Sequence, residues 1–95
     1  MGGNVRARKK DSNHDLIAEA FRKCGWYWID TYQFAYFKPG WFDGMAIRNG
    51  IVLGVEIKAG KGILTPDEEA FHREWPGPIV IVRNIEDVLA LTEEW

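Results

Sequence analysis

The stretch Phe42–Ala59 has the sequence FDGMAIRNGIVLGVEIKA, and it decides the expected fold. Two segments rich in apolar residues, 42–48 and 51–59, flank the dipeptide Asn49-Gly50. This dipeptide favours the left-handed backbone of a two-residue type I′ turn, a common connection in β-hairpins. The stretch is therefore predicted to form two antiparallel strands joined by a tight turn.

The turn also fixes which residues face each other across the hairpin. With a two-residue loop, Arg48 pairs with Ile51, and counting back along both strands places Asp43 opposite Glu56. Side chains alternate between the two faces of a strand, so Lys58 shares the face of Glu56. This end of the hairpin is thus predicted to gather two carboxylates and one ammonium group.

Upstream of the hairpin, apolar residues at helical spacing predict a helix from Ser12 to Gly25. Ser12 begins a pattern that resembles a capping box, and Gly25 is a typical C-terminal stop. Residues 26–30 are rich in strand-forming residues. Residues 31–38 either extend that strand or form an aromatic loop, and the dipeptide at 39–40, Pro-Gly, ends the segment.

Downstream of the hairpin, a connector at 60–62 contains two glycines and leads to a second helix. Thr65-Pro66 is a strong helix start, with Thr as the N-cap and Pro at the first helical position, and Trp75-Pro76 ends the helix. Residues 79–82 are continuously apolar, which predicts a strand covered on both faces. Asn84 is expected to cap a final short helix.

The predicted order is α-β-β-β-α-β-α, which indicates an α/β fold. A helix connects the third and fourth strands, so these two should be parallel with a right-handed crossover. The first three strands should form an antiparallel meander, giving a mixed sheet flanked by helices. Residues 11–95 are expected to form one domain, preceded by a basic arm at residues 1–10.

Composition excludes several classes of protein. The chain has 95 residues, a formal net charge of −2, a single cysteine, and 13 aromatic residues (five Trp, three Tyr and five Phe). One cysteine excludes a disulfide framework and a cysteine-based zinc site. No apolar stretch approaches the ~18 residues of a membrane span, and no apolar region follows the basic N-terminus as in a secretory signal. We therefore expect a cytoplasmic protein without a membrane partner or an organic cofactor.

The opposed carboxylates Asp43 and Glu56 indicate a cation at the hairpin end. Like charges directly opposed across a sheet are destabilising, and a buried charge without a partner is costly. Lys58 supplies one positive charge, and a divalent ion would supply the rest. Carboxylate oxygens without His or Cys suit Mg²⁺ or Mn²⁺. The alternative is a structural ion pair between Glu56 and Lys58, with Asp43 as an ordinary turn residue.

These residues carry a resemblance to a known family. Phe42-Asp43 followed by Glu56-Ile57-Lys58 on the next strand resembles the PD-(D/E)XK nuclease signature, and the chain is most similar to small phage-type VRR-NUC and Holliday-junction-resolvase-like nucleases. Supporting segments, in chain order, are Asn13-His14, Phe21-Arg22, Gly25, Leu64-Thr65 and Ile79–Val82. The resemblance implies a restriction-endonuclease-like core and a Mg²⁺-dependent DNA endonuclease selective for junctions or flaps. It also implies a bacterial or phage-infected cell.

The resemblance further implies roles for individual residues. Asp43, Glu56 and the backbone carbonyl of Ile57 would hold the metal ion, and Lys58 would orient or help to deprotonate the attacking water. The motif's proline is replaced by Phe42. Many relatives carry an acidic residue on the first helix where this chain has His14. His14 would support the attacking water or contact a phosphate.

Other polar residues have both a functional and a structural explanation. Glu68 is either an auxiliary site residue or the partner of Thr65 in a capping box, and we favour the cap. His72 on the same helix is expected to be exposed and without function. Lys61 in the glycine-rich connector either reaches a phosphate or is a solvated loop residue. The basic arm, with Arg6, Arg8, Lys9 and Lys10, either contacts phosphates or is a solvated, disordered tail.

DNA is the expected partner, together with a second copy of the chain. The aromatic block at 26–41 is too large for one small core to bury, so its exposed part is expected to hold a homodimer. Two other hypotheses are a non-catalytic nucleic-acid-binding module on the same fold and a small protein-interaction domain. Neither of them needs the charged cluster of Asp43, Glu56 and Lys58.

Overall fold

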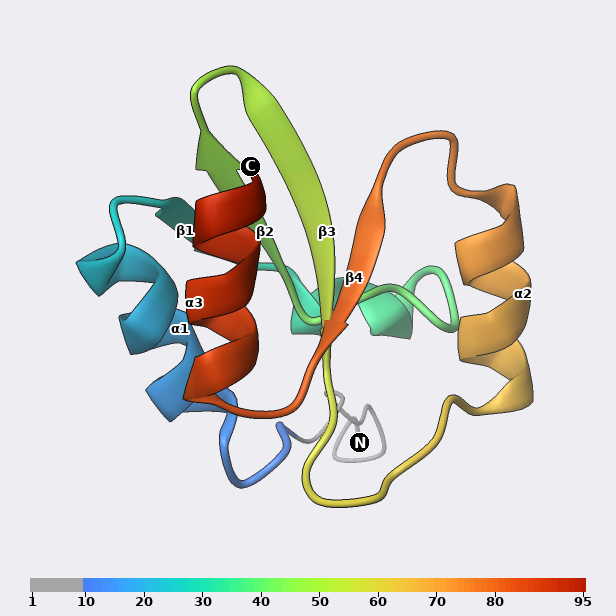
Figure 1. Ribbon diagram of the computed structural model, residues 1–95. Coiled ribbons are helices and arrows are strands. Elements are labelled where there is room, and N and C mark those ends of the chain that lie inside the picture. The colour runs from blue at the N-terminus through green and yellow to red at the C-terminus, as the bar shows by residue number, and fades with distance from the viewer. Residues whose placement is uncertain (1–9) are drawn as a thin grey trace.

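A computed structural model describes residues 10–95 and shows an α/β fold with three α-helices and a four-stranded mixed sheet (Figure 1). The predicted order of helices and strands is confirmed, with one short 3₁₀-helix added between the first two strands. The elements are α1 (His14–Lys23), β1 (Tyr27–Asp30), the 3₁₀-helix η2 (Tyr32–Tyr36), β2 (Gly44–Arg48), β3 (Ile51–Ile57), α2 (Pro66–Glu74), β4 (Ile79–Val82) and α3 (Ile85–Glu94). No helix within the described residues is long and apolar enough to cross a membrane.

The sheet has the predicted topology. Its strand order is β1-β2-β3-β4, in which β1 and β2 are antiparallel, β2 and β3 are antiparallel, and β3 and β4 are parallel. Arg48 pairs with Ile51 as predicted. Asn49 and Gly50 have φ angles of 51° and 80°, the left-handed backbone that a type I′ turn requires. The hairpin register inferred from this dipeptide is therefore confirmed for residues 44–48 and 51–55.

The first helix begins one residue later than the predicted capping box implies. Its N-cap is Asn13, and neither Ser12 nor Asn13 caps it through a side-chain hydrogen bond within the described residues, so the capping-box prediction was wrong. The Asn13 amide instead donates to the carbonyl oxygen of Arg83 at 3.0 Å and, at 3.5 Å, to that of Lys58. The side chain thus ties the start of α1 to the ends of β3 and β4.

The end of α1 matches the prediction. Gly25 has φ of 90°, and the Trp26 N–H donates to the carbonyl of Phe21 at 3.0 Å. The Gly25 N–H donates to the carbonyl of Arg22 at 3.0 Å, which completes a Schellman motif. This turn directs the chain from α1 straight into β1.

Two predicted strand bounds were too long. β2 begins at Gly44 rather than at residue 42, and β3 ends at Ile57 rather than at residue 59. At this end the Ile57 N–H donates to the Asp43 side chain and not to a carbonyl of the neighbouring strand, so the regular ladder stops here. The ladder therefore opens at the residues of the predicted charged cluster.

The fourth strand is less buried than its sequence suggested. A strand covered on both faces was predicted, but Ile81 is 41% exposed and, of its four residues, only Val82 is fully buried. β4 lies at the edge of the four-stranded sheet, where covering of both faces is incomplete. Its apolar run therefore does not mark a central strand.

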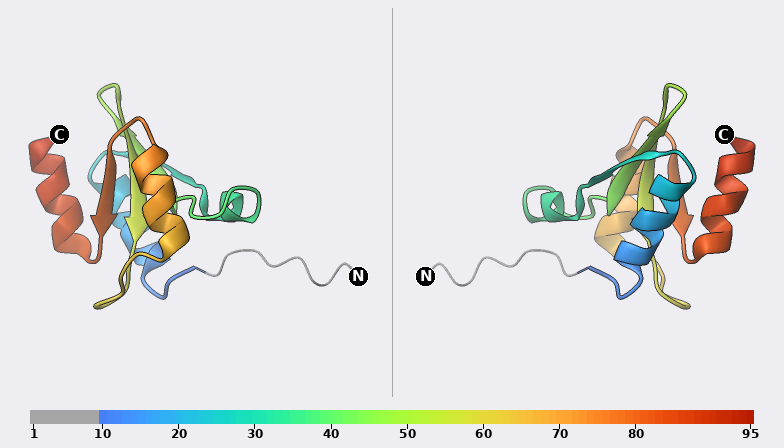
Figure 2. Two further views of the ribbon diagram at one scale, coloured as in Figure 1. Left: turned by 90° about the vertical axis from the view of Figure 1, so that its right-hand side faces the viewer. Right: turned by 90° about the vertical axis from the view of Figure 1, so that its left-hand side faces the viewer.

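Helices cover the two faces of the sheet differently. Leu53, Val55 and Ile57 of β3 belong to a buried apolar core formed with residues of α1 and with Val88 of α3. The alternate residues of β3 face α2, whose Phe71 and the adjacent Trp75 pack against Phe42 and Trp41. Edge-on views show α3 on one side of the sheet and η2 projecting on the other (Figure 2). Glu56 thus lies on the α2 face.

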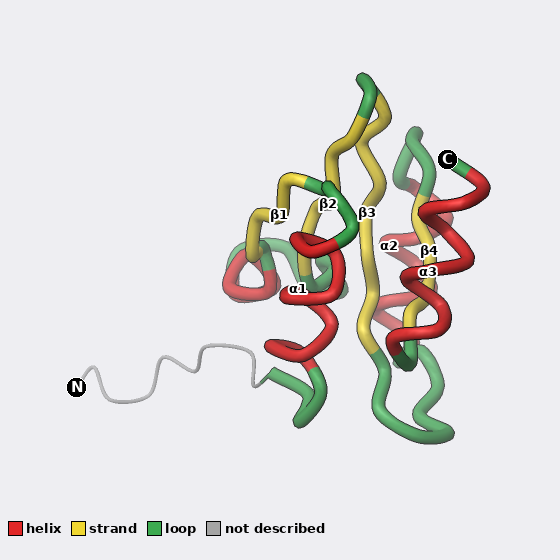
Figure 3. Tube along the Cα trace, turned by 60° about the vertical axis from the view of Figure 1, so that its left-hand side comes forward, coloured by secondary structure: helices red, strands yellow, loops and turns green. Residues whose placement is uncertain are grey.

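All three α-helices begin at the same end of the molecule. In Figures 1 and 3, α1, α2 and α3 begin at the end where β3 and β4 finish, whereas the β2–β3 turn and the C-terminus lie at the opposite end. Because helix N-termini carry a partial positive charge, this end favours anionic groups. It is also the end at which Asp43 and Glu56 are found.

We expect Gly54→Ala to be strongly destabilising. A Cβ at this position would lie 2.6 Å from the ring of Phe42, which is itself fully buried among aromatic side chains. Overpacking of this kind costs about 1–3 kcal/mol, and we expect a value near the top of that range in urea unfolding. Gly62→Ala is the control, because the nearest atom to its Cβ would be 3.3 Å away at an exposed position. Equal stability of the two variants would contradict this account of the packing.

Candidate active site

The two predicted carboxylates lie at the open end of the hairpin. The paired register ends at Gly44 and Val55, so the predicted pairing of Asp43 with Glu56 is not part of the ladder. The Asp43 N–H donates to the carbonyl of Val55 at 2.9 Å, which holds Asp43 against β3 although β2 has not yet begun. The side chains are buried, with 3% of Asp43 and none of Glu56 exposed. Two acidic groups are therefore buried near the open end of the hairpin.

The backbone of Ile57 contacts the Asp43 carboxylate. Its N–H donates to Oδ2 of Asp43 at 2.7 Å, a short bond that orients the carboxylate. Within a strand the N–H and C=O of one residue point to the same side. The Ile57 carbonyl is therefore directed toward the Asp43 side of β3, as a third oxygen ligand would have to be.

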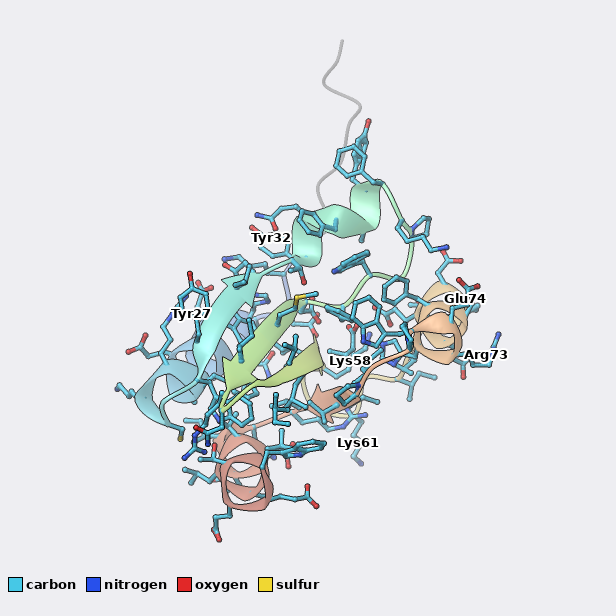
Figure 4. The ribbon with its side chains drawn as sticks, turned by 90° about the horizontal axis from the view of Figure 1, so that it is seen from above. Tyr27, Tyr32, Lys58, Lys61, Arg73 and Glu74 are labelled. Carbon is cyan, nitrogen blue, oxygen red and sulfur yellow. The ribbon has the colours of Figure 1, made fainter. Side chains whose placement is uncertain are left out.

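Lys58 extends from the end of β3 toward α2 (Figure 4). Its Nζ lies 3.8 Å from Oε2 of Glu56 and 2.7 Å from Oε1 of Glu68, with 11% of the side chain exposed. The predicted grouping of Glu56 and Lys58 is thus present, and α2 supplies a further carboxylate. Ion pairs this deeply buried require good geometry to offset the loss of hydration.

Glu68 forms the predicted cap of α2 and also contacts Lys58. The capping box is confirmed, because the Thr65 N–H donates to Oε1 of Glu68 at 2.9 Å and the Glu68 N–H donates to Oγ1 of Thr65 at 3.2 Å. The same Oε1 accepts the hydrogen bond from Lys58. The cap of α2 is therefore also part of the charged cluster.

His72 was missed by sequence reasoning. It was expected to be exposed, but only 15% of its side chain is, and Nε2 lies 3.6 Å from Oε1 of Glu56. His72 follows Glu68 by four residues, so both project from the same face of α2. That spacing is the sequence signal that could have placed His72 in the cluster.

His14 lies on the other face of the sheet. It is fully buried, its Nε2 is 2.8 Å from Oδ1 of Asp30, and its ring packs edge-on against Trp28 and Tyr32. Trp28 belongs to the core shared with α1, whereas Glu56 faces α2. The structure thus brings His14 together with Asp30, a residue that the sequence analysis did not select. The alternation of Trp28 and Asp30 along β1 could have indicated this pairing.

The pKa of Asp30 lies below its usual value. Partial burial raises it, but the hydrogen bonds from His14 and Trp28 and the nearby charges of His14 and Lys10 more than offset that effect. Trp28 Nε1 donates to the same Oδ1 at 2.7 Å. The fold therefore stabilises the charged form of Asp30.

We expect the contribution of Asp30 to stability to depend on pH. A lowered pKa means that the contribution is present above the usual Asp pKa of about 3.9 and is lost as the pH falls through the folded-state value. Because 38% of the side chain is exposed, we expect Asp30→Asn to cost only about 1 kcal/mol near neutral pH. Urea unfolding of both proteins between about pH 3 and 7 measures this. A difference that does not shrink at low pH would contradict the assignment.

The remaining predicted residues lie around this end of the molecule or outside the described part. Lys61 is exposed in the connector after β3, where the Arg83 guanidinium donates to the carbonyls of Gly60 at 3.0 Å and Gly62 at 2.7 Å. Lys10 is bonded to Asp15 at 2.9 Å, and this hydrogen bond raises the pKa of Lys10. The other three basic residues of the arm, Arg6, Arg8 and Lys9, precede the described residues.

Comparisons with known proteins were made for the whole chain. No family model matches this sequence. No curated protein matches it at a significant level either. The geometry of the cluster is therefore the basis for a functional proposal. Within residues 10–95, no three His, Cys, Asp or Glu side chains are arranged so that they could hold a metal ion.

Proposed function

We propose that this protein is a metal-dependent endonuclease that hydrolyses phosphodiester bonds in DNA. The observation that carries the proposal is the arrangement of Asp43, Glu56 and Lys58 at the open end of one hairpin. Two buried carboxylates and an ammonium group 3.8 Å from one of them form a set that a purely structural hairpin end does not need. Burial of such groups costs free energy, which suggests a functional reason for keeping them.

The order of the elements supports the same proposal. A helix, an antiparallel meander of three strands, a crossover helix and a parallel fourth strand are what the restriction-endonuclease-like core of the PD-(D/E)XK nucleases would show. The residues that resemble their signature, Phe42-Asp43 and Glu56-Ile57-Lys58, lie just before β2 and at the end of β3. We therefore propose this fold family as the finer description of the α/β fold.

The donor atoms of the cluster fit a small divalent cation. Asp43 and Glu56 offer carboxylate oxygens. The carbonyl of Ile57 points to the side of β3 that faces Asp43. Oxygen ligands of this kind suit Mg²⁺ or Mn²⁺. When bound, such a cation would act as a Lewis acid that polarises the scissile phosphate and makes water a better nucleophile.

Different residues of the chain would then bind the cation, orient the water and contact the DNA. Asp43 is oriented by its hydrogen bond from Ile57, so the direction of its carboxylate group is fixed. Lys58 would orient the attacking water and offset negative charge that develops on the phosphate. The helix starts gathered at this end would favour an anionic substrate. The basic arm and Lys61 are proposed to contact phosphates outside the reacting group, and a role of His14 in catalysis stays a prediction.

Cleavage assays test the proposal. Purified protein is incubated with a four-way junction, a flapped duplex, and supercoiled plasmid, each with Mg²⁺, with Mn²⁺ or with EDTA. We expect metal-dependent cleavage, with the junction or the flap preferred over intact duplex. Absence of cleavage of all three substrates with both metals would reject the enzyme assignment.

We also propose that the protein acts as a homodimer. Apolar rings on and after η2 are exposed, with 45% of Phe34, 50% of Tyr36 and 81% of Phe37 accessible. Light scattering at micromolar concentration should give twice the 10.9 kDa mass of the chain, and Phe37→Asp should return it to one chain. Tyr27→Asp, at a residue that is 68% exposed on β1, is the matched control and should remain dimeric. A monomeric wild-type protein would contradict this part of the proposal.

A further inference from the structure

Lys58 is held more closely by α2 than by its own strand. Its Nζ is 2.7 Å from Oε1 of Glu68 but 3.8 Å from Oε2 of Glu56. A lysine side chain has four rotatable bonds and a compact charge, so without a partner it samples many positions. The shorter, charge-assisted contact to Glu68 therefore sets where the ammonium group lies.

Glu68 is itself held rigidly. Its Oε1 also accepts from the Thr65 N–H, while Oγ1 of Thr65 accepts from the Glu68 N–H, so two hydrogen bonds fix the first turn of α2. Only 4% of Glu68 and 9% of Lys58 is exposed. Glu68 thus links the start of a helix to the ammonium group through a single oxygen atom.

We infer that Glu68 is a positioning residue for Lys58. It holds the ammonium group at the end of β3, 2.7 Å from Oε1 of Glu68 and 3.8 Å from Oε2 of Glu56. This inference rests on the proposed function for its catalytic consequence, but the placement of Lys58 can be measured without any reaction. A cap alone would explain the bond to Thr65, whereas it does not explain why the same oxygen accepts from Lys58.

The test compares three variants whose effects on the cap and on Lys58 differ. Glu68→Ala removes both contacts of Oε1. Glu68→Gln keeps an acceptor for Thr65, as in Gln-containing capping boxes, but removes the charge that attracts Lys58. Thr65→Ala is the matched control, because it removes the other half of the capping box and leaves the Glu68 carboxylate in place. All three are compared as folded proteins, after their melting temperatures have been measured.

The first readout is the reaction of the Lys58 amine with formaldehyde and a mild reductant, followed by mass spectrometry in the absence of metal and DNA. We expect labelling of Lys58 to rise about tenfold in Glu68→Ala and by a smaller factor in Glu68→Gln, since a charge-assisted bond is about twice as strong as a neutral one. Thr65→Ala should label like wild type. Unchanged labelling in both Glu68 variants, or an equal rise in Thr65→Ala, would overturn the inference.

The second readout is DNA cleavage under single-turnover conditions. We expect the rate at saturating DNA to fall about tenfold in Glu68→Ala, with DNA affinity unchanged, and to be retained in Thr65→Ala. If the wild-type protein cleaves no DNA, the proposed function fails while the labelling result still decides the placement of Lys58. If labelling changes as expected but the cleavage rate does not, Glu68 positions a lysine that the reaction does not use, and the inference is overturned in its catalytic part.

Discussion

Asp43→Asn and Glu56→Gln should each abolish DNA cleavage, lowering the rate by about a thousandfold or more, since a missing charge in a preorganised site typically costs several kcal/mol of transition-state stabilisation. Each substitution removes one of the two carboxylates that would hold the cation. The shape of the side chain is retained, so the loss should reflect charge rather than packing. The measurement is single-turnover cleavage of a junction or flap with Mg²⁺.

Folding should survive both substitutions. Asn at 43 still offers an oxygen to the Ile57 N–H, and each change removes one of two buried negative charges. We expect the free energy of unfolding without metal to stay within about 1 kcal/mol of wild type or to rise. Undiminished cleavage by either variant, in preparations free of contaminating nuclease, would end the assignment of these residues.

Lys58→Ala should lower the cleavage rate by about a hundredfold while DNA affinity changes little, since general acid–base groups typically contribute this much to a rate. Lys58 is almost buried and sits among carboxylates, so most of its side chain is not accessible to a phosphate backbone. Lys58 is expected to stabilise the transition state, so its loss should lower the cleavage rate at saturating DNA. The assay measures DNA binding with EDTA and single-turnover cleavage with Mg²⁺ for the same two proteins.

An opposite pattern would assign Lys58 a different role. If affinity collapsed while the rate at saturating DNA stayed at the wild-type value, Lys58 would be only a phosphate contact. Lys61→Ala is the matched control, because Lys61 is exposed in the connector (Figure 4) and should affect affinity more than rate. Equal effects of the two substitutions on both quantities would remove the distinction between them.

The hairpin was predictable because local chemistry determines it. Asn49-Gly50 fixes the turn, and the turn fixes the register from the pair Arg48 and Ile51 as far as the pair Gly44 and Val55. Asp43 lies beyond the last pair, where its N–H bonds to Val55, and the turn alone did not predict that. The starts of α2 and α3 follow in the same way from Thr65 and Asn84, whose side chains cap the two helices as expected. Such features depend on residues a few positions apart, so one sequence suffices to infer them.

Contacts between elements were not predictable from the same patterns. The Asn13 side chain bonds to the ends of β3 and β4 and not to the first turn of α1. Asp30 contacts His14 because α1 packs on the face of β1 that carries Trp28. Likewise, His72 approaches Glu56 because α2 covers the opposite face. These pairs are set by how helices dock on the sheet, which no single stretch of sequence determines.

Direct measurement of Mn²⁺ binding by calorimetry tests the central claim, that Asp43 and Glu56 form a site for a divalent cation. The experiment uses the full chain, without DNA and with a short flapped duplex, together with the Asp43→Asn, Glu56→Gln and Lys58→Ala variants. We predict binding to the wild-type protein, its loss in both carboxylate variants, and its retention in Lys58→Ala, where one nearby positive charge is removed. Equal Mn²⁺ binding by all four proteins, or none by the wild-type protein under either condition, would contradict the claim.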